Sequence, residues 1–154
     1  LGHSTGGAAM LETIWDYPAG IDRAVLLAPL LAPRRFALNS SFARVSSLFS
    51  PAGPIPGPKQ GYLCFDRMPF AWVRALGVYR SRIGKRETIE IPVLAIQGDA
   101  DRAINWNANV RVISRIAPDA ELHLLSGRGH VLFDRSAGQE ETLAVIKAFL
   151  DKAE

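Results

Sequence analysis

Two uninterrupted apolar runs constrain the fold of this chain more than any other feature. They are RAVLLA, at Arg23–Ala28, and PVLAIQG, at Pro92–Gly98. Strands without polar alternation are covered on both faces, as in a parallel sheet between two layers of helices. A third run, AELHLL at Ala120–Leu125, partly alternates and also favours a strand. The three runs predict strands of a parallel sheet.

Segments with helical spacing alternate with these strands. GGAAMLETIWDYP, at Gly6–Pro18, repeats apolar residues at helical spacing and ends at a proline. Asn105 is a candidate N-cap for a further helix that Pro118 ends. Residues 136–154 predict an amphipathic helix with an apolar stripe formed by Leu143, Ile146, Phe149 and Leu150. Strands that alternate with helices predict an α/β fold.

Residues 33–88 interrupt this alternation. The proline-rich stretch PAGPIPGP, at Pro51–Pro58, predicts a loop, and Phe70–Arg82 has helical spacing. The region is too rich in Phe, Leu and Trp to be a flexible linker. We therefore predict core segments at residues 1–32 and 89–154, with an inserted, mainly helical segment at 33–88.

Composition excludes several classes of protein. With 48% apolar and 21% charged residues, the 154-residue chain resembles a globular domain, and no apolar run is long enough to span a bilayer. The net charge is +3 and the basic residues are scattered, so no nucleic-acid partner is predicted. The single cysteine, Cys64, favours a reducing compartment, and we expect a cytoplasmic protein. Three histidines and one cysteine at these spacings predict no metal site.

Three stretches with reactive side chains fall at the ends of strands. GHSTG, at Gly2–Gly6, fits G-x-S-x-G, which holds Ser4 on a sharp turn between a strand and a helix. GDADR and SGRGH follow the second and third runs, and they supply an acid, Asp99 or Asp101, and His130. Ligands gather at the carboxyl ends of such strands, so these side chains should meet there. Their order along the chain, Ser, Asp, His, is that of α/β-hydrolases.

The chemistry of acyl transfer explains each residue type. A serine hydroxyl becomes a nucleophile when His130 takes its proton, and His130 can then protonate the leaving group. A buried carboxylate fixes the imidazole tautomer and stabilises the imidazolium. Small residues at Gly2 and Gly6 should let the turn close near Ser4. The backbone N–H of Thr5 is predicted to supply one donor of the oxyanion hole.

The other histidines and the arginine pair receive structural interpretations. His3 lies in the turn itself and is interpreted as a structural residue near the site. His123 lies within the third strand and is interpreted as a surface or packing residue. Arg34 and Arg35 have the charge to attract an anionic headgroup, but a solvated pair is the simpler interpretation.

The stretches GHSTGG, PVLAIQGDADR and GRGHVLF resemble those of α/β-hydrolases in the monoglyceride lipase and lysophospholipase branch, the serine aminopeptidase-like group. The resemblance extends over nearly the whole chain and covers the C-terminal portion of that fold. It implies that residues 33–88 form a cap between core segments. It also selects Asp101 over Asp99, which gives a triad of Ser4, Asp101 and His130.

Two departures from the family accompany this resemblance. The family's elbow is commonly GHSMGG, so Thr5 replaces a methionine. The earlier strands of the fold and the loop with the second oxyanion donor are not in the sequence. We therefore expect a fragment, with the N-terminal half of the fold as its missing partner. The isolated chain is expected to be poorly soluble and nearly inactive.

Together these features predict a serine hydrolase that cleaves a carboxylic ester through an acyl-enzyme and uses no cofactor. The resemblance and the apolar cap favour a fatty-acyl monoester, such as a monoglyceride or a lysophospholipid. They also make the cap a candidate for peripheral membrane contact. Two alternatives remain: a peptidase or thioesterase on the same scaffold, and a non-catalytic binding module derived from a hydrolase.

Overall fold

A computed structural model describes five segments of the chain, at residues 1–34, 55–56, 67–68, 70–133 and 139–152. The chain divides into two compact units. One unit joins Leu1–Arg34 to Arg86–Glu154, and the other is Arg35–Lys85. The first unit contains all three stretches with reactive side chains. The role of residues 33–88 as a cap stays a prediction.

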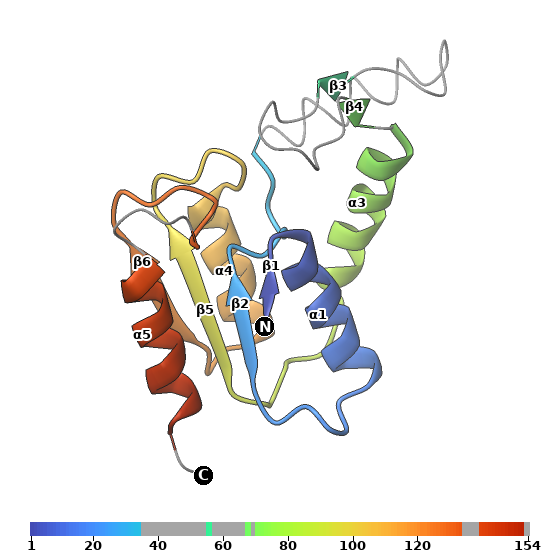
Figure 1. Cartoon of the computed structure of the whole chain (residues 1–154). Helices are drawn as coiled ribbons and strands as arrows, with labels where there is room; N and C mark the ends of the chain where they lie inside the picture. The colour runs from blue at the N-terminus through green and yellow to red at the C-terminus, as the bar shows by residue number, and fades with distance from the viewer. Residues whose placement is uncertain (35–54, 57–66, 69, 134–138, 153–154) are drawn as a thin grey trace. The chain divides into compact units, whose positions relative to one another are not determined.

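A parallel sheet of four strands forms the centre of the first unit within the described residues (Figure 1). The strand order is β1-β2-β5-β6, and every neighbouring pair is parallel. The strands are β1 at Gly2–His3, β2 at Ala24–Leu27, β5 at Val93–Gly98 and β6 at Glu121–Leu125. The three apolar runs therefore form adjacent strands, which confirms the predicted α/β class.

Strands β2 and β5 are buried along their whole length, as their uninterrupted apolar sequences predict. Their side chains alternate between the two faces of the sheet. On one face, Leu27 and Ile96 pack in a cluster with Phe149 of the C-terminal helix. The alternate residues, such as Leu26 and Ala95, are buried as well. Both faces of the two central strands are therefore covered.

Helices α1 at Thr5–Asp16 and α4 at Trp106–Ile116 contact the strands that precede them. As expected, α1 ends before Pro18, which cannot continue the hydrogen-bonding pattern of a helix. The predicted N-cap of α4 is confirmed, because Asn105 Oδ1 accepts the N–H of Ala108 at 3.2 Å. No helix within the described ranges is long and apolar enough to cross a bilayer.

The C-terminal helix, α5 at Gln139–Leu150, differs from its predicted stripe. Ile146 and Phe149 are buried, but Leu143 is 47% exposed and Leu150 is 53% exposed. The third buried position is Thr142, which lies four residues before Ile146 and so shares its face. The prediction was wrong for the two leucines because helical spacing alone allows more than one buried face.

The second unit contains α3 at Phe70–Ile83, in agreement with the predicted helix. It also contains a short antiparallel pair, β3 at Ile55–Pro56 with β4 at Arg67–Met68. The loop predicted for Pro51–Pro58 is therefore wrong at Ile55–Pro56. A proline is tolerated in such a strand because a two-stranded ladder has only edges. Cys64 lies outside the described residues.

Candidate active site

Ser4 lies on the turn between β1 and α1, with φ of 52° and ψ of −119°. A positive φ is strained for a residue that has a Cβ, and it persists only where neighbouring groups hold the backbone. The N–H of Ser4 donates to the Leu27 carbonyl at 2.9 Å, and the Ser4 carbonyl accepts the N–H of Leu30 at 2.9 Å. The end of β2 therefore holds the turn that presents the Ser4 hydroxyl.

Close backbone packing explains the glycine at position 2 of this turn. A Cβ at Gly2 would lie 2.6 Å from the carbonyl oxygen of Gly6, and a Cβ at Gly7 would lie 2.8 Å from the Cβ of Pro29. A Cβ at Gly6 would meet nothing within 4 Å in the described part of the chain. Among the described residues, the expectation that position 6 must be small is therefore wrong. The close approach that requires a glycine lies at Gly7 instead.

We expect Gly2→Ala to lower the free energy of unfolding by about 1–3 kcal/mol, the usual cost of overpacking. Gly6→Ala is the matched control, because it adds the same methyl group to open space and alanine favours the helix more than glycine does. Urea denaturation measures both variants. An equal loss in the two, or none in Gly2→Ala, would contradict the packing argument.

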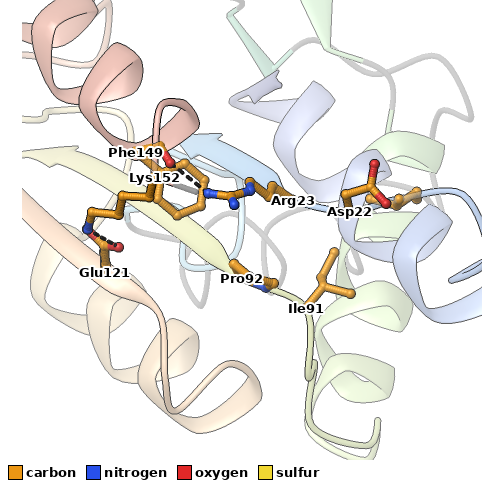
Figure 2. Close-up of a pocket in the computed structure, with 8 residues that line it drawn as sticks. Asp22, Arg23, Ile91, Pro92, Glu121, Phe149 and Lys152 are labelled. Carbon is orange, nitrogen blue, oxygen red and sulfur yellow. Dashed lines mark hydrogen bonds and ion pairs between the residues drawn. The ribbon is translucent and has the colours of Figure 1, made fainter. Parts of the chain in front are cut away.

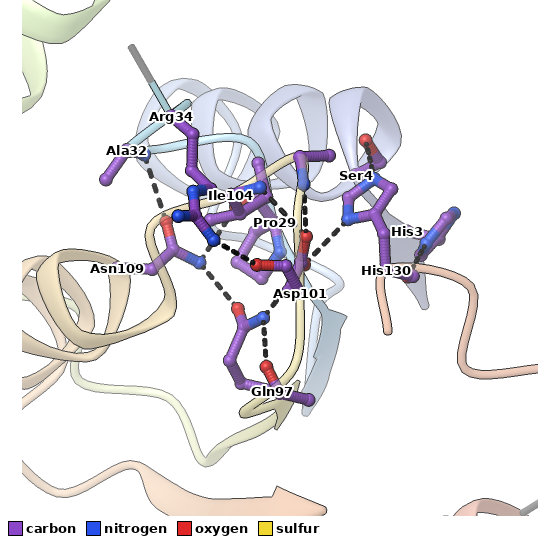
Figure 3. Close-up of polar contacts among 12 residues, drawn as sticks. His3, Ser4, Pro29, Ala32, Arg34, Gln97, Asp101, Ile104, Asn109 and His130 are labelled. Carbon is purple, nitrogen blue, oxygen red and sulfur yellow. Dashed lines mark hydrogen bonds and ion pairs between the residues drawn. The ribbon is translucent and has the colours of Figure 1, made fainter. Parts of the chain in front are cut away.

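The loops after β5 and β6 bring Asp101 and His130 to Ser4 (Figure 3). Ser4 Oγ donates to His130 Nε2 at 2.9 Å. His130 Nδ1 donates to Asp101 Oδ2 at 2.8 Å. A carboxylate can only accept, so the proton of the neutral ring lies on Nδ1 and leaves Nε2 free to accept from Ser4. The three side chains thus form one continuous chain of hydrogen bonds.

The carboxyl group of Asp101 is buried, with 1% of the residue exposed. Its Oδ1 accepts the backbone N–H groups of Ala103 and Ile104, each at 2.8 Å. Burial alone raises the pKa of this carboxyl, but hydrogen bonds from His130 and from the two backbone N–H groups outweigh that effect. The pKa of Asp101 is therefore held below its ordinary value, and the group stays ionised at neutral pH.

The two aspartates that the sequence pattern left open have different surroundings. Asp101 contacts the His130 ring, whereas Asp99 Oδ1 accepts the N–H of Gly127 at 2.7 Å. The loop after β6 also lies close to β5, because a Cβ at Gly98 would be 2.3 Å from the Arg128 carbonyl oxygen. Asp99 thus binds the loop that leads to His130, and Asp101 binds the ring itself.

We expect Asp101 to make stability depend on pH under acid conditions. Its folded pKa lies below the unfolded value of about 3.9. The contribution of the ionised Asp101 to the free energy of unfolding is therefore fully present above about pH 4. It is lost as the pH falls through the folded pKa. The wild type should lose stability relative to Asp101→Asn below about pH 4, as measured by urea unfolding. If the difference in free energy of unfolding between the wild type and Asp101→Asn stayed constant with pH, the pKa of Asp101 would not be lowered.

Two other sequence candidates lie next to the triad. His3 Nε2 donates to the backbone carbonyl of His130 at 2.9 Å, and the two ring centroids are 5.0 Å apart. Arg34 is exposed, but its guanidinium also donates to the Asp101 carbonyl at 3.3 Å, a contact that the sequence did not indicate. Arg35 lies outside the described residues, and His123 is exposed on β6.

Two buried amides beside the triad were missed by the sequence interpretation. Gln97 is 2% exposed and Asn109 is fully buried. The sequence holds a feature at each position that could have indicated a buried polar residue. Gln97 is a polar residue inside an otherwise apolar strand, and Asn109 lies four residues before Ile113 on the buried face of α4. A buried polar side chain needs a partner, so such positions often mark a hydrogen-bonded network.

The N–H of Thr5 begins α1 and has no acceptor within the described part of the chain. The first N–H groups of a helix lack partners in the helix itself, which makes them donors for an anion. Its role in an oxyanion hole stays a prediction. In the same described residues, no cluster of His, Cys, Asp and Glu could hold a metal ion.

A pocket of about 560 Å³ lies at the other end of the sheet, where the parallel strands begin (Figure 2). Arg23 precedes β2, and Ile91 and Pro92 precede β5. Three charged groups at its wall have partners within the protein: Arg23 donates to the Phe149 carbonyl at 3.0 Å, and Lys152 pairs with Glu121 at 2.6 Å. Since Ser4 lies at the carboxyl end of the sheet, this pocket is separate from the triad.

Comparison with known proteins adds to this geometry. Neither a family model nor a curated protein matches the chain. A monoacylglycerol lipase from Paleococcus ferrophilus matches with a TM-score of 0.75 and 20% identity over 97% of this chain and 66% of that one. A soluble variant of monoglyceride lipase from Saccharomyces cerevisiae matches with a TM-score of 0.73 and 19% identity, over 99% of this chain and 62% of that one. Mouse α/β-hydrolase domain-containing protein 10 matches with a TM-score of 0.71 and 19% identity, over 97% of this chain and 60% of that one.

These likenesses show that the chain has the α/β-hydrolase fold. Two of the three structures are monoglyceride lipases, which is the branch that the sequence motifs resemble. The chain spans between 60% and 66% of the length of these structures. The prediction of a partial α/β-hydrolase fold agrees with that coverage.

Proposed function

We propose that this chain carries the catalytic centre of a serine hydrolase that cleaves carboxylic esters. The observation that supports the proposal most strongly is the hydrogen-bonded chain from Ser4 through His130 to Asp101. It lies at the carboxyl edge of a parallel sheet, where such folds bind their ligands. The strained backbone of Ser4 is a second support, because nucleophiles of this fold lie on such a turn.

The proposed reaction has two halves. In the first, Ser4 Oγ bonds to the carbonyl carbon of the ester while His130 Nε2 accepts its proton. The resulting imidazolium is stabilised by the ionised Asp101, and the Thr5 N–H donates to the oxyanion. His130 then gives its proton to the departing alkoxide, which leaves an acyl group on Ser4. In the second half, His130 takes a proton from water as the water oxygen attacks the acyl carbonyl. His130 then returns that proton to Ser4 Oγ as the bond between Ser4 and the acyl group breaks, which releases a carboxylic acid and restores the serine.

The proposed substrate is a fatty-acyl monoester, such as a monoglyceride or a lysophospholipid. Two of the structural relatives are named as lipases of this kind, and the motifs of the chain resemble the same branch. Residues 33–88 are proposed to form the cap that receives the acyl chain and contacts the lipid surface, because the segment is rich in Phe and Leu.

Hydrolysis of a substrate panel tests this proposal, and it is measured on the full-length protein that contains this chain, because the isolated chain is expected to be nearly inactive. The panel contains a monoacylglycerol, a lysophospholipid, a p-nitrophenyl ester, an acyl thioester and a peptide amide, with product release measured for each. We expect the oxygen esters with long acyl chains to give the highest kcat/KM. Faster turnover of the thioester or the amide would replace the proposed substrate class. A protein that carries no activity in the panel and no acyl group on Ser4 would contradict the catalytic proposal.

A further inference from the structure

Two buried amide side chains connect the backbone of the core to Asp101 (Figure 3). Asn109 Oδ1 accepts the N–H of Ala32 at 3.0 Å, and its Nδ2 donates to the Pro29 carbonyl at 2.9 Å. The same Nδ2 donates to Gln97 Oε1 at 3.0 Å. Gln97 Nε2 donates in turn to Asp101 Oδ2 at 3.1 Å. These contacts join α4 and β5 to the carboxylate.

Backbone groups fix the direction of every bond in this path. The Ala32 N–H can only donate and the Pro29 carbonyl can only accept, so the Asn109 amide has one satisfied orientation. Its nitrogen then faces Gln97, which must present its oxygen there and its nitrogen to Asp101. Turning either amide would bring two donors or two acceptors together in a buried site, which is costly.

The path completes a set of donors around the carboxylate. Oδ1 of Asp101 faces the N–H groups of Ala103 and Ile104, and Oδ2 faces Gln97 Nε2 and His130 Nδ1. All four neighbours donate. A protonated carboxyl group would place a fifth donor where no acceptor faces it, so the site favours the ionised form.

We propose that Gln97 and Asn109 are positioning residues that keep Asp101 ionised and aimed at His130. This inference rests on the proposed function, because it assigns Asp101 the role of the triad acid. Asn109 acts on the orientation of Gln97, and Gln97 acts on Asp101 through a single hydrogen bond. The hydrogen bonds of the two amides go to Asp101, to backbone groups and to each other, and not to Ser4 or His130.

Two further charged or titratable side chains, Arg34 and His3, have contacts with Asp101 or His130 within the described residues. The Arg34 guanidinium contacts the backbone carbonyl of Asp101, and the His3 ring lies beside His130. From β5 and α4, the side chains that face Asp101 along the path are the neutral amides of Gln97 and Asn109. A change at Gln97 therefore alters the hydrogen bonding of Asp101 without altering the nearby charges.

The test is a titration of Asp101 by NMR of ¹³C-labelled aspartate side chains, with Asp101→Asn to assign the signal. In Gln97→Met, which keeps the size of the side chain but removes the donor, we expect the pKa of Asp101 to rise by about one unit, the effect of one hydrogen bond to a charged group. We also expect kcat for an ester to fall about tenfold, with a smaller change in KM.

Asn109→Asp provides a second variant that reverses the path. A carboxylate at position 109 still accepts from Ala32, but it can donate neither to Gln97 nor to the Pro29 carbonyl. The Gln97 amide should then turn its oxygen towards Asp101. We expect this to raise the pKa of Asp101 at least as much as Gln97→Met does. Asn105→Asp is the matched control, since it adds the same charge to the same helix at an exposed cap where aspartate is also favoured. It should leave the Asp101 titration unchanged.

Each variant is first checked for native folding by near-UV circular dichroism. If Asn109→Asp does not fold, the test rests on Gln97→Met alone. A folded Gln97→Met protein with the wild-type titration and wild-type kcat would overturn the inference and leave the proposed function intact. A shifted titration together with a full-length wild-type protein that hydrolyses no ester would support the path and contradict the function. An equal shift in Asn105→Asp would show a general charge effect and would also overturn the inference.

Discussion

In the full-length protein that contains this chain, Ser4→Ala is expected to abolish ester hydrolysis, with kcat lower by about a millionfold, as for other serine nucleophiles. The variant removes the oxygen that forms the acyl-enzyme, and neither His130 nor Asp101 can replace it. It should also stop labelling by a fluorophosphonate, which reacts only with a serine whose proton is taken by a base. Mass spectrometry of the labelled protein should place the adduct on Ser4.

Ser114→Ala is a suitable control for this experiment. Ser114 is an exposed serine on α4, so its loss tests whether labelling depends on the activated hydroxyl rather than on any serine. We expect full labelling and full activity in this variant. Labelling that persists in Ser4→Ala would show that another residue is the nucleophile.

Asp101→Asn is expected to lower kcat by about ten thousandfold, the effect of holding a triad histidine in the wrong tautomer. The two backbone N–H groups of Ala103 and Ile104 require an oxygen at their position. The amide nitrogen must therefore face His130, where it meets Nδ1 as a second donor. The ring then moves its proton to Nε2 and can no longer accept from Ser4.

Asp99→Asn is the matched control for that substitution. It makes the same chemical change two residues away, and its amide oxygen can still accept the N–H of Gly127. We expect kcat to change by less than about tenfold, because the loop before His130 keeps its hydrogen bond. Steady-state assays at pH values between about 6 and 9 compare the two variants. A larger loss in Asp99→Asn would reverse the assignment of the acid.

Local sequence patterns were sufficient to predict strands β2, β5 and β6 and helices α1, α3 and α4. Uninterrupted apolar runs indicate strands that are covered on both faces, and β2 and β5 are buried throughout. Because side-chain period and helix caps are local properties, α1, α4 and the Asn105 cap also followed from the sequence. The helix α5 shows the limit of this argument, since its period is local but the face that packs on the sheet is set by the rest of the fold.

The sequence by itself determined the order Ser, Asp, His and the position of each residue after a strand. It did not determine which aspartate contacts His130, because Asp99 and Asp101 both follow β5 and differ only in the path of the loop. The tertiary structure decided this, through backbone N–H groups that bind Oδ1 of Asp101 and a Gly127 N–H that binds Asp99.

The same holds for the path through Gln97 and Asn109. They are twelve residues apart in the sequence and meet only because α4 packs beside β5, and the backbone groups that orient them come from the segment after β2. Hydrogen bonds between distant segments depend on where packing brings those segments. Sequence spacing can indicate that a buried amide needs a partner, but only the packed fold decides which partner it has.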